Sequence, residues 1–512
     1  MRSFGKALAS GLCVALALGG AALVVAAPAS AAACDPENLN TRADIDGDGA
    51  ADAVIGMPSY GPASGAVDIR GTGSPAVLLT AADLGAGTGD GDVFGSSIAM
   101  ADLDQDGCAD LVIAAPAEGQ SGGTDGEGGL EGQVHLVFGQ AGGVDTSSSI
   151  VVPHDSSNGD RFGTALALVS RYDETAGKYL NDLYVGAPGA TVAGHAQAGE
   201  VFRYTIAPSS VGRVTLTLRE VRSQDSVGVP GSAETGDAFG SVLAATGRGG
   251  VLVGAPDEKV GSVPGAGAVW FLRVNAAGTS ITSQSWSQNS TGVAGTAETD
   301  DRFGSVLGSR GSVAVVGVPD EDSGSHPDTG MIQTFNQASG TDLFSPGRSI
   351  SQDSAGIPGK KETGDRFGAA VAVGVWLLCQ ESIDVAIGAP GEDVGTRPDA
   401  GAITLVSMDG EAQCPAKSIR QGSGLAGALE AGDEVGSVLG LTRADTDLEE
   451  DYADRLLIGV PKEDIGAKTD AGSVQSVTDG IWADGVAYSS LKFSEGYLLT
   501  NHYGTVLSTP AG

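Results

Sequence analysis

The sequence predicts an all-β protein, a seven-bladed β-propeller, because two short motifs alternate along its 512 residues. One motif is a Gly-x-Pro strand end, with Ala in place of Gly once, and the other is an aromatic or apolar residue followed by Gly. Neighbouring copies lie between 58 residues (Gly56 to Ala114) and 77 residues (Phe162 to Phe239) apart. A period this long, with several β-like runs per unit, is typical of repeat proteins. The first motif starts at Gly56, Ala114, Gly186, Gly254, Gly317, Gly388 and Gly459, and the second at Phe94, Phe162, Phe239, Phe303, Phe367, Val435 and Tyr503.

Each unit reads as four antiparallel strands, which is the content of a propeller blade. In the unit after Gly91 we expect strands at 94–100, 111–114 and 133–138, and a more polar fourth strand at 148–152. Pro116 ends the second strand because proline cannot donate to a central ladder. We attribute the glycine after each aromatic residue to crowding of the inner strands around the axis.

The two ends of the chain predict how the ring closes. The first Gly-x-Pro unit has no aromatic-Gly strand before it, and residues 501–508 form such a strand with no further strands after it. We therefore expect the C-terminal strand to complete the first blade beside the N-terminal strands, which removes two exposed sheet edges.

These motifs, recurring in register from Gly56-Met57-Pro58 to Tyr503-Gly504, resemble the FG-GAP repeats of integrin α-subunits and of related secreted bacterial proteins. The resemblance covers nearly all of the chain after its N-terminal apolar run. It implies an extracellular binding or cell-adhesion module. The chain lacks the inserted ligand-binding domain, leg domains and transmembrane segment of integrins, so integrin-style signalling is not implied. It also lacks the catalytic domain that accompanies such a propeller in the glycosylphosphatidylinositol-specific phospholipase.

The N-terminus indicates export. Arg2 and Lys6 precede an apolar run at 7–27, and small residues near Ala33 allow cleavage. We expect residues 1–33 to be a signal peptide and residues 34–512 to be the propeller, secreted as a monomer. A membrane anchor and a lipid anchor at Cys34 are the alternatives. No other segment is long and apolar enough to cross a bilayer, so we expect no membrane insertion.

The net charge of the chain limits the classes of partner that it can bind. The formal net charge is −36, and removing Arg2 and Lys6 makes it −38. This balance argues against nucleic acid and anionic membranes, which require basic surfaces. It favours bound cations or basic ligands, with solubility alone as the alternative.

Four cysteines remain after processing, which suggests two disulfides with three connectivities open. Proximity in the repeat pattern favours Cys34–Cys108 and Cys379–Cys414.

Two loops are the strongest candidates for a metal site, because each places aspartates at positions one, three, five and nine around a glycine. Calcium takes about six to eight oxygen ligands at flexible geometry, and this spacing converges carboxylates on one point. Position twelve is an isoleucine within a strand, so neither loop is an EF-hand. The alternative is an Asp-rich solvated turn, whose carboxylates would repel one another without a cation. The expected ligands, including the position-seven carbonyls of Ala50 and Cys108, are Asp44, Asp46, Asp48, Ala50 and Asp52, and Asp102, Asp104, Asp106, Cys108 and Asp110.

Weaker acidic loops occur elsewhere. The segment Asp445–Asp454 lacks the glycine but is a candidate third calcium site, whereas Asp173, Glu174 and Asp182 in blade three predict none.

Further carboxylates should gather on the opposite face, because they lie in connections at the other ends of the strands. They form either a binding face for basic or polyhydroxyl ligands, with or without further cations, or a solvated surface. The residues are Asp257-Glu258, Glu321-Asp322, Glu392-Asp393 and Glu463-Asp464, with Glu234 and Asp237, Glu298 and Asp301, Glu362 and Asp365, and Glu430 and Asp433.

The sequence names no catalytic residue. The segment Gly119–Gly123 matches a G-x-S-x-G nucleophile pattern but lies in a Gly-rich loop without partners placed to complete a triad. An extracellular protein or glycan ligand is therefore the preferred partner. The alternative function is a secreted esterase or glycosidase acting at the central channel, and the fold does not decide between them.

Overall fold

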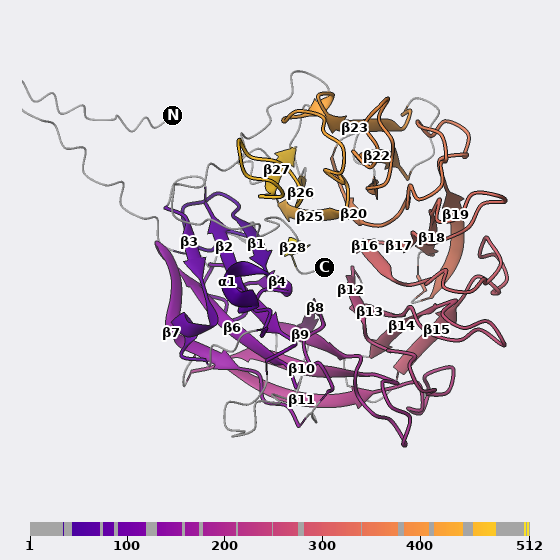
Figure 1. The fold of residues 1–512 in the computed structure, drawn as a ribbon. Coiled ribbons are helices and arrows are strands. Elements are labelled where there is room, and N and C mark those ends of the chain that lie inside the picture. Colours follow the sequence, from indigo (N-terminus) through magenta and orange to yellow (C-terminus); the bar gives the residue numbers. More distant parts are fainter. Residues whose placement is uncertain are drawn as a thin grey trace, which may run out of the picture.

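Seven β-sheets surround a central axis in the computed structural model, and together they form a β-propeller (Figure 1). The structure describes residues 34, 43–71, 75–86, 91–118, 131–155, 159–173, 178–210, 213–247, 249–274, 281–338, 340–341, 343–376, 383–408, 414–443, 454–477, 506–507 and 509–510. The expected signal peptide lies outside these residues.

The blades follow one another along the chain, and consecutive strands within a blade pair antiparallel, except for one short parallel strand at the edge of blade six. Blade one contains β1 (Ala53–Met57), β2 (Ala66–Arg70) and β3 (Val77–Leu79). Blade two contains β4 (Ser97–Ala101), β5 (Asp110–Ala115), β6 (Gln133–Gln140) and β7 (Gly143–Val151). Blade three contains β8 (Ala165–Asp173), β9 (Lys178–Ala187), β10 (Glu200–Pro208) and β11 (Val214–Arg222). Blade four contains β12 (Val242–Thr246), β13 (Gly250–Ala255), β14 (Ala268–Val274) and β15 (Ile281–Trp286).

The later blades repeat this plan. Blade five contains β16 (Val306–Arg310), β17 (Val313–Val318), β18 (Met331–Gln337) and β19 (Phe344–Ile350). Blade six contains β20 (Val371–Gly374), β21 (Asp384–Ala389), β22 (Ala402–Ser407), β23 (Lys417–Gln421) and the short β24 (Gly424–Leu425). The described part of blade seven contains β25 (Val438–Arg443), β26 (Asp454–Val460) and β27 (Ser473–Val477).

The C-terminus closes the ring as predicted. Strand β28 (Val506–Leu507) pairs antiparallel with β1, with Gly56 opposite Val506 and Ile55 opposite Leu507. A further strand that the sequence did not predict, β29 (Thr509–Pro510), pairs parallel with β4 of blade two. The last residues of the chain therefore bind two neighbouring blades. The motif copy Tyr503-Gly504 lies outside the described residues.

The aromatic-Gly motif precedes the inner strand and does not begin it, so the strand expected at 94–100 is wrong over its first residues. Phe94 and Gly95 form a turn in which Gly95 has φ of 85°, a left-handed conformation that glycine adopts without strain. Strand β4 then starts at Ser97. The outer strand of the same blade, expected at 148–152, is longer and spans Gly143–Val151.

The two motifs meet across the junction between neighbouring blades, which corrects the explanation based on crowding at the axis. A Cβ placed on Gly56 would lie 2.1 Å from the carbonyl oxygen of Gly95, in the next blade. The corresponding glycines Gly186, Gly254, Gly317 and Gly388 would each place a Cβ between 1.8 and 2.2 Å from the same carbonyl of the following blade. The glycines therefore allow the backbones of adjacent blades to touch.

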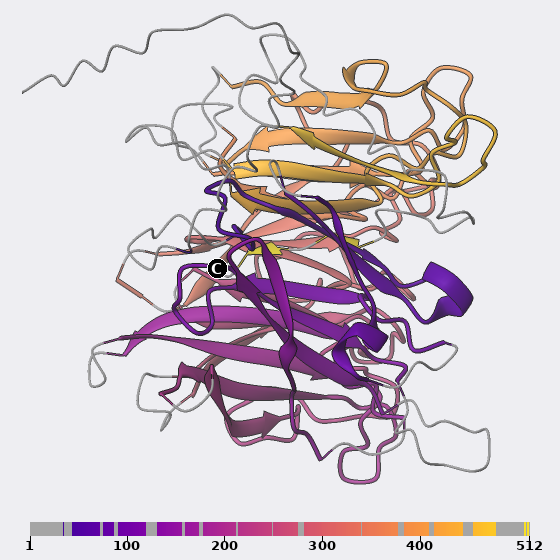
Figure 2. The same ribbon diagram turned by 90° about the vertical axis from the view of Figure 1, so that its left-hand side faces the viewer.

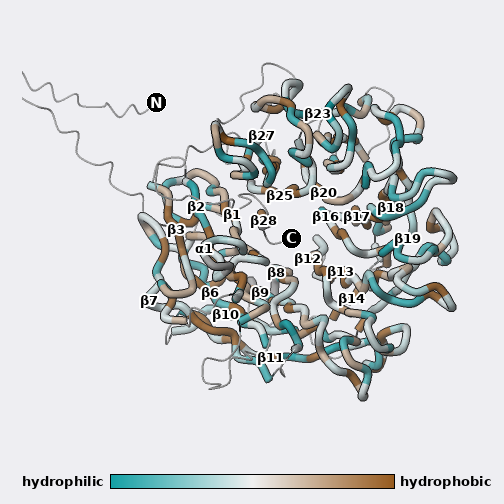
Figure 3. The backbone as a smooth tube through the Cα atoms, viewed as in Figure 1, coloured by the Kyte–Doolittle hydropathy of each residue, from teal (hydrophilic) through white to brown (hydrophobic). Residues whose placement is uncertain are grey.

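The aromatic residues of the motif fill the core between blades. Phe94, Phe162, Phe239, Phe303 and Phe367 are all 0% exposed. Hydrophilic colour in Figure 3 is concentrated on the outer strands and loops, for instance around β11 and β19. The strands run between two faces, from which the connecting loops project (Figure 2). Helical structure within the described residues is limited to the short α1 (Tyr60–Ala63) and a 3-10 turn at Ala81–Leu84, and none of it is long enough to cross a membrane.

Candidate metal centre

The first acidic loop, called loop one below (residues 44–52), leads into β1. The carboxylates of Asp44, Asp46 and Asp48 each offer an oxygen within 4.8 Å of the others. Two left-handed glycines, Gly47 with φ of 72° and Gly49 with φ of 86°, wrap the backbone around these carboxylates. Both oxygens of Asp44 accept backbone N–H bonds, from Gly47 at 2.8 Å and from Gly49 at 2.9 Å. The loop is therefore held in a shape that converges three acids.

Asp52, at position nine of loop one, lies behind this cluster. Its Oδ2 accepts the backbone N–H of Ile45 at 2.7 Å, whereas its Oδ1 is buried and has no hydrogen-bond partner. Burial, with repulsion from Asp46 and Asp44, raises the pKa of Asp52 to about 8, and burial also raises the pKa of Asp44. An unpartnered buried carboxylate oxygen beside three converging acids fits a bound divalent cation.

The second acidic loop, called loop two below (residues 102–110), joins β4 to β5. Here Asp102, Asp104 and Asp110 each offer an oxygen within 4.8 Å of the others. Asp110 is 0% exposed, and its oxygens accept backbone N–H bonds from Leu103 at 2.7 Å and Gly139 at 2.9 Å. Burial and neighbouring aspartates raise the pKa of Asp102 to about 6 and that of Asp110 well above its ordinary value. These residues also fit a divalent cation.

Arg213, which precedes β11 of blade three, reaches loop two and forms ion pairs with its aspartates. Its guanidinium lies 2.8 Å from Asp104 and 3.1 Å from Asp106, with Asp145 at 3.4 Å. The same group stands 5.1 Å from the ring centre of Phe138. Arg213 therefore contacts Asp104, which belongs to the cluster of three, and Asp106, which does not. No sequence pattern indicates this contact, because Arg213 lies more than a hundred residues from Asp104 and Asp106 along the chain.

The two loops are physically joined. The Cys34–Cys108 disulfide, predicted from the sequence, is present, with Cα atoms 5.1 Å apart. Its sulfurs are bonded to each other, so neither thiol is available to a metal or a lipid. The Ala109 N–H donates to the Asp44 carbonyl at 2.6 Å. A Cβ on Gly139 would lie 2.3 Å from the Ala109 carbonyl and 2.7 Å from the Ile45 carbonyl, so only glycine fits where the loops meet.

The acidic loops of blades three and seven are arranged differently from loops one and two. Asp182 of blade three has its charge balanced by Arg171 at 2.8 Å and Arg203 at 3.3 Å. In blade seven, Asp454 starts β26, accepts the Val375 N–H at 2.9 Å and pairs with Arg310 at 3.2 Å. The remaining acids of that loop, Asp445 to Asp451, lie outside the described residues. So do Gly119–Gly123 and Cys379, although Cys414 is disulfide-bonded.

The opposite face carries the predicted second set of acids, called the acidic rim below. Topology places it there, because these acids lie in the connections between the second and third strands of a blade and before its first strand. Glu258, Glu321, Glu392 and Glu463 are each half-buried and accept a hydrogen bond from a glutamine of the preceding blade. The sequence reasoning missed these glutamines, although the repeated Ser-Gln-x-Ser segments at 223–226, 287–290 and 351–354 were a signal for them.

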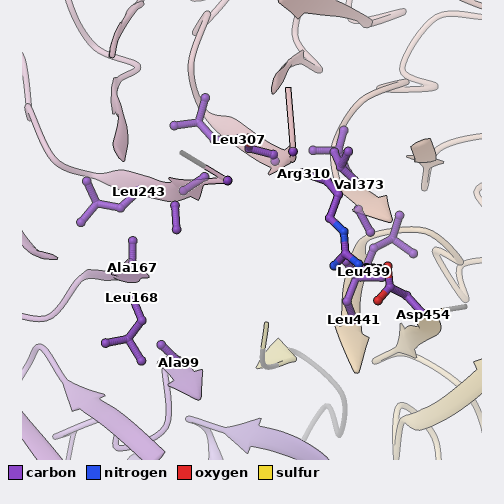
Figure 4. Close-up of a pocket in the computed structure, with 18 of the residues that line it drawn as sticks. Ala99, Ala167, Leu168, Leu243, Leu307, Arg310, Val373, Leu439, Leu441 and Asp454 are labelled. Carbon is purple, nitrogen blue, oxygen red and sulfur yellow. Dashed lines mark ion pairs between the residues drawn. The ribbon is translucent and has the colours of Figure 1, made fainter. Parts of the chain in front are cut away.

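The central channel holds a cavity of about 470 Å³ (Figure 4). Its wall is largely aliphatic, formed by inner-strand residues such as Leu243, Leu307 and Val373. Among the described lining residues, only Ser309, Arg310 and Asp454 carry polar side chains, and Arg310 pairs with Asp454.

Comparisons with known proteins agree with this architecture. The family model for the FG-GAP repeat matches residues 94–136. Human integrin alpha-IIb is 33% identical over 163 residues, which is 29% of this chain and 14% of the integrin. Mouse integrin alpha-IIb is 31% identical over 173 residues, which is 32% of this chain and 16% of the integrin. The matched segments are thus a small part of those relatives.

The matching solved structures are more distant in sequence. A putative 6-phosphogluconolactonase from Bacteroides fragilis is 10% identical with a TM-score of 0.40, covering 86% of this chain and 94% of that one. A mutant NanB sialidase from Streptococcus pneumoniae is 9% identical with a TM-score of 0.36, covering 74% of this chain and 66% of that one.

Proposed function

This protein is an FG-GAP repeat β-propeller, and we propose that it is a secreted, calcium-binding module that attaches to an extracellular protein or glycan. The observation that carries the proposal is the pair of acidic loops, each with three carboxylates converging within 4.8 Å. Calcium suits them better than magnesium, because magnesium keeps several waters and takes few protein ligands. The ligand set we propose is the four aspartates of each loop with the carbonyls of Ala50 and Cys108.

Export supports the same reading. Residues 1–33 have the charge and apolar pattern of a signal peptide, and a disulfide between Cys34 and Cys108 suits an oxidising compartment. The integrin similarity motivates attachment as the activity, with the strongly acidic rim as the surface that meets a basic or polyhydroxyl ligand. We propose that the protein acts as a monomer comprising residues 34–512.

The test is a glycan and peptide array probed with the labelled protein in calcium, run beside a broad esterase and glycosidase panel. We expect array ligands whose binding weakens in high salt and in chelator, because charge and calcium both support it. Substrate turnover in the panel without any array ligand would overturn the proposal.

A further inference from the structure

Four blades carry the same buried group of side chains on the acidic rim. Each group, called a rim cluster below, contains a glutamine from the preceding blade, a glutamate after the second strand and an aspartate before the first strand. The four rim clusters are Gln224, Glu258 and Asp237 in blade four; Gln288, Glu321 and Asp301 in blade five; Gln352, Glu392 and Asp365 in blade six; and Gln421, Glu463 and Asp433 in blade seven.

The glutamine fixes the glutamate in each cluster. The Gln224 amide nitrogen donates to Glu258 at 2.7 Å and that of Gln352 donates to Glu392 at 2.5 Å, with the same bond in blades five and seven. The glutamines are between 1% and 6% exposed. All four amide oxygens are buried without a hydrogen-bond partner. The same unpartnered acceptor in four blades, each beside a carboxylate, indicates that a partner is missing from each cluster.

The aspartate brings a second carboxylate to each cluster. These aspartates are between 0% and 2% exposed, and one oxygen of each accepts the backbone N–H of the glutamate three residues earlier. The other oxygen of Asp365 is buried without a partner. In blade four the Asp237 and Glu258 carboxyls lie close enough for each to influence the pKa of the other. Burial, then repulsion from Asp237, raises the pKa of Glu258 to about 7, and Glu321 shows the same effect.

The described ion pairs of the rim's basic side chains do not involve the clusters, although the charge of Arg420 opposes the rise in the pKa of Glu392. Within the described ranges, the lysines and arginines form their ion pairs with outer acids, such as Arg366 with Asp320 at 2.8 Å and Arg302 with Asp257 at 3.7 Å. None of the described ion pairs reaches a carboxylate of a rim cluster. A proton shared by the two carboxyls would reduce their repulsion but would leave the amide oxygen without a partner. A divalent cation bound between the two carboxylates would neutralise both, and hard divalent cations prefer oxygen ligands of this kind.

Glycine residues pack directly against two of the rim clusters. A Cβ on Gly295 would lie 2.6 Å from the Gln288 amide nitrogen and 3.1 Å from a Glu321 oxygen, and Gly427 stands over Gln421 and Glu463 in the same way. The backbone therefore closes over the clusters where a side chain would clash.

We propose that each rim cluster binds one divalent cation, so that a second set of four metal sites lies on the face opposite loops one and two. Blades two and three lack the full set: Glu118 of blade two faces His135 at 3.5 Å, and blade three has Ala190 in place of the glutamate. The proposal does not rest on the ligand suggested under the proposed function.

The experiment counts bound calcium by equilibrium dialysis of the whole protein. Replacing Glu258, Glu321, Glu392 and Glu463 with Gln should lower the number of bound ions by four per chain. The matched control replaces the adjacent exposed acids Asp257, Asp322, Asp393 and Asp464 with Asn, which removes equal charge from the same loops and should leave the count unchanged. An equal loss in both variants would mean a diffuse counterion layer and would overturn the proposal. An unchanged count in the glutamine variant would also overturn it.

A second measurement examines the blade-four cluster alone. It needs only single variants, so it remains informative if the fourfold variant does not fold. A Cβ on Gly231 would lie 3.6 Å from the Gln224 amide nitrogen and 3.7 Å from a ring atom of Trp270, so the indole stands beside the blade-four cluster. Tb³⁺ at this cluster should therefore luminesce on tryptophan excitation. E258Q alone should remove this component and one bound calcium, and W270F should remove the component while the calcium count stays unchanged. Luminescence that persists in both single variants would contradict a cation at this cluster.

Discussion

Blades one and two carry the same aspartate spacing, yet the structure balances their charges differently. Loop two has Arg213 across Asp104 and Asp106, whereas in loop one a buried oxygen of Asp52 has no hydrogen-bond partner. Blade one also depends on the far end of the chain for its inner strand, and its N-terminal Cys34 is fixed to loop two. One motif can therefore depend on a cation to different degrees, according to what packs beside it.

The largest effect should come from removing the closing strands. Deleting residues 506–512 takes away β28 and β29, which exposes the edge of β1 in blade one and the edge of β4 in blade two. We expect aggregation or loss of cooperative unfolding, measured by light scattering and thermal melting. Deleting only residues 511–512 is the control. A monomeric truncation with an unchanged melting midpoint would contradict ring closure.

The disulfide should have the next largest effect. Replacing both Cys34 and Cys108 with Ser removes a cross-link over a sequence separation of 74 residues. Chain entropy predicts a loss of about 4 kcal/mol in the free energy of unfolding. Chemical denaturation measures it. A midpoint equal to that of the unmodified protein would show that the link does not fasten blade one to blade two.

Arg213 tests the difference between the loops directly. R213Q should lower the free energy of unfolding in chelator by about 1–3 kcal/mol, because charged hydrogen bonds to Asp104 and Asp106 are lost. Calcium should then stabilise the variant more than it stabilises the unmodified protein. Arg219, within β11, bonds Thr205 and not the loop, so R219Q is the matched control. An identical calcium increment in R213Q would mean that Arg213 does not substitute for a cation.

The smallest effect concerns His154, at the end of blade two. His154 stacks on Phe162, with ring centres 4.2 Å apart, and burial lowers its pKa from 6.5. The unfolded chain therefore binds a proton before the folded chain does, so stability falls as the pH drops below about 6.5. H154F should remove this part of the pH dependence in denaturant midpoints measured from pH 7 to pH 5. An unchanged pH profile in H154F would exclude His154 as its source.

The sequence sufficed for features that depend on spacing along the chain. Blade number, closure by the C-terminal strand and the Cys34–Cys108 link follow from motif order. The convergence of Asp44, Asp46 and Asp48 follows from alternation around glycine.

Contacts between blades could not be predicted, because they depend on which distant residue the ring brings alongside. Arg213 reaches loop two from the next blade, and each rim glutamine binds a glutamate of the next blade. The contact between Gly56 and Gly95 likewise became apparent only when adjacent blades were placed together.

The central claim, that loops one and two hold calcium, is tested most directly by thermal melting in calcium, in magnesium and in chelator. At a free calcium concentration roughly a hundredfold above Kd, binding at one site should add about 2.7 kcal/mol to the free energy of unfolding. The calcium increment should fall more in D46N than in D104N, because Arg213 already balances part of the charge of loop two. A melting midpoint that is the same in calcium and in chelator would contradict the account.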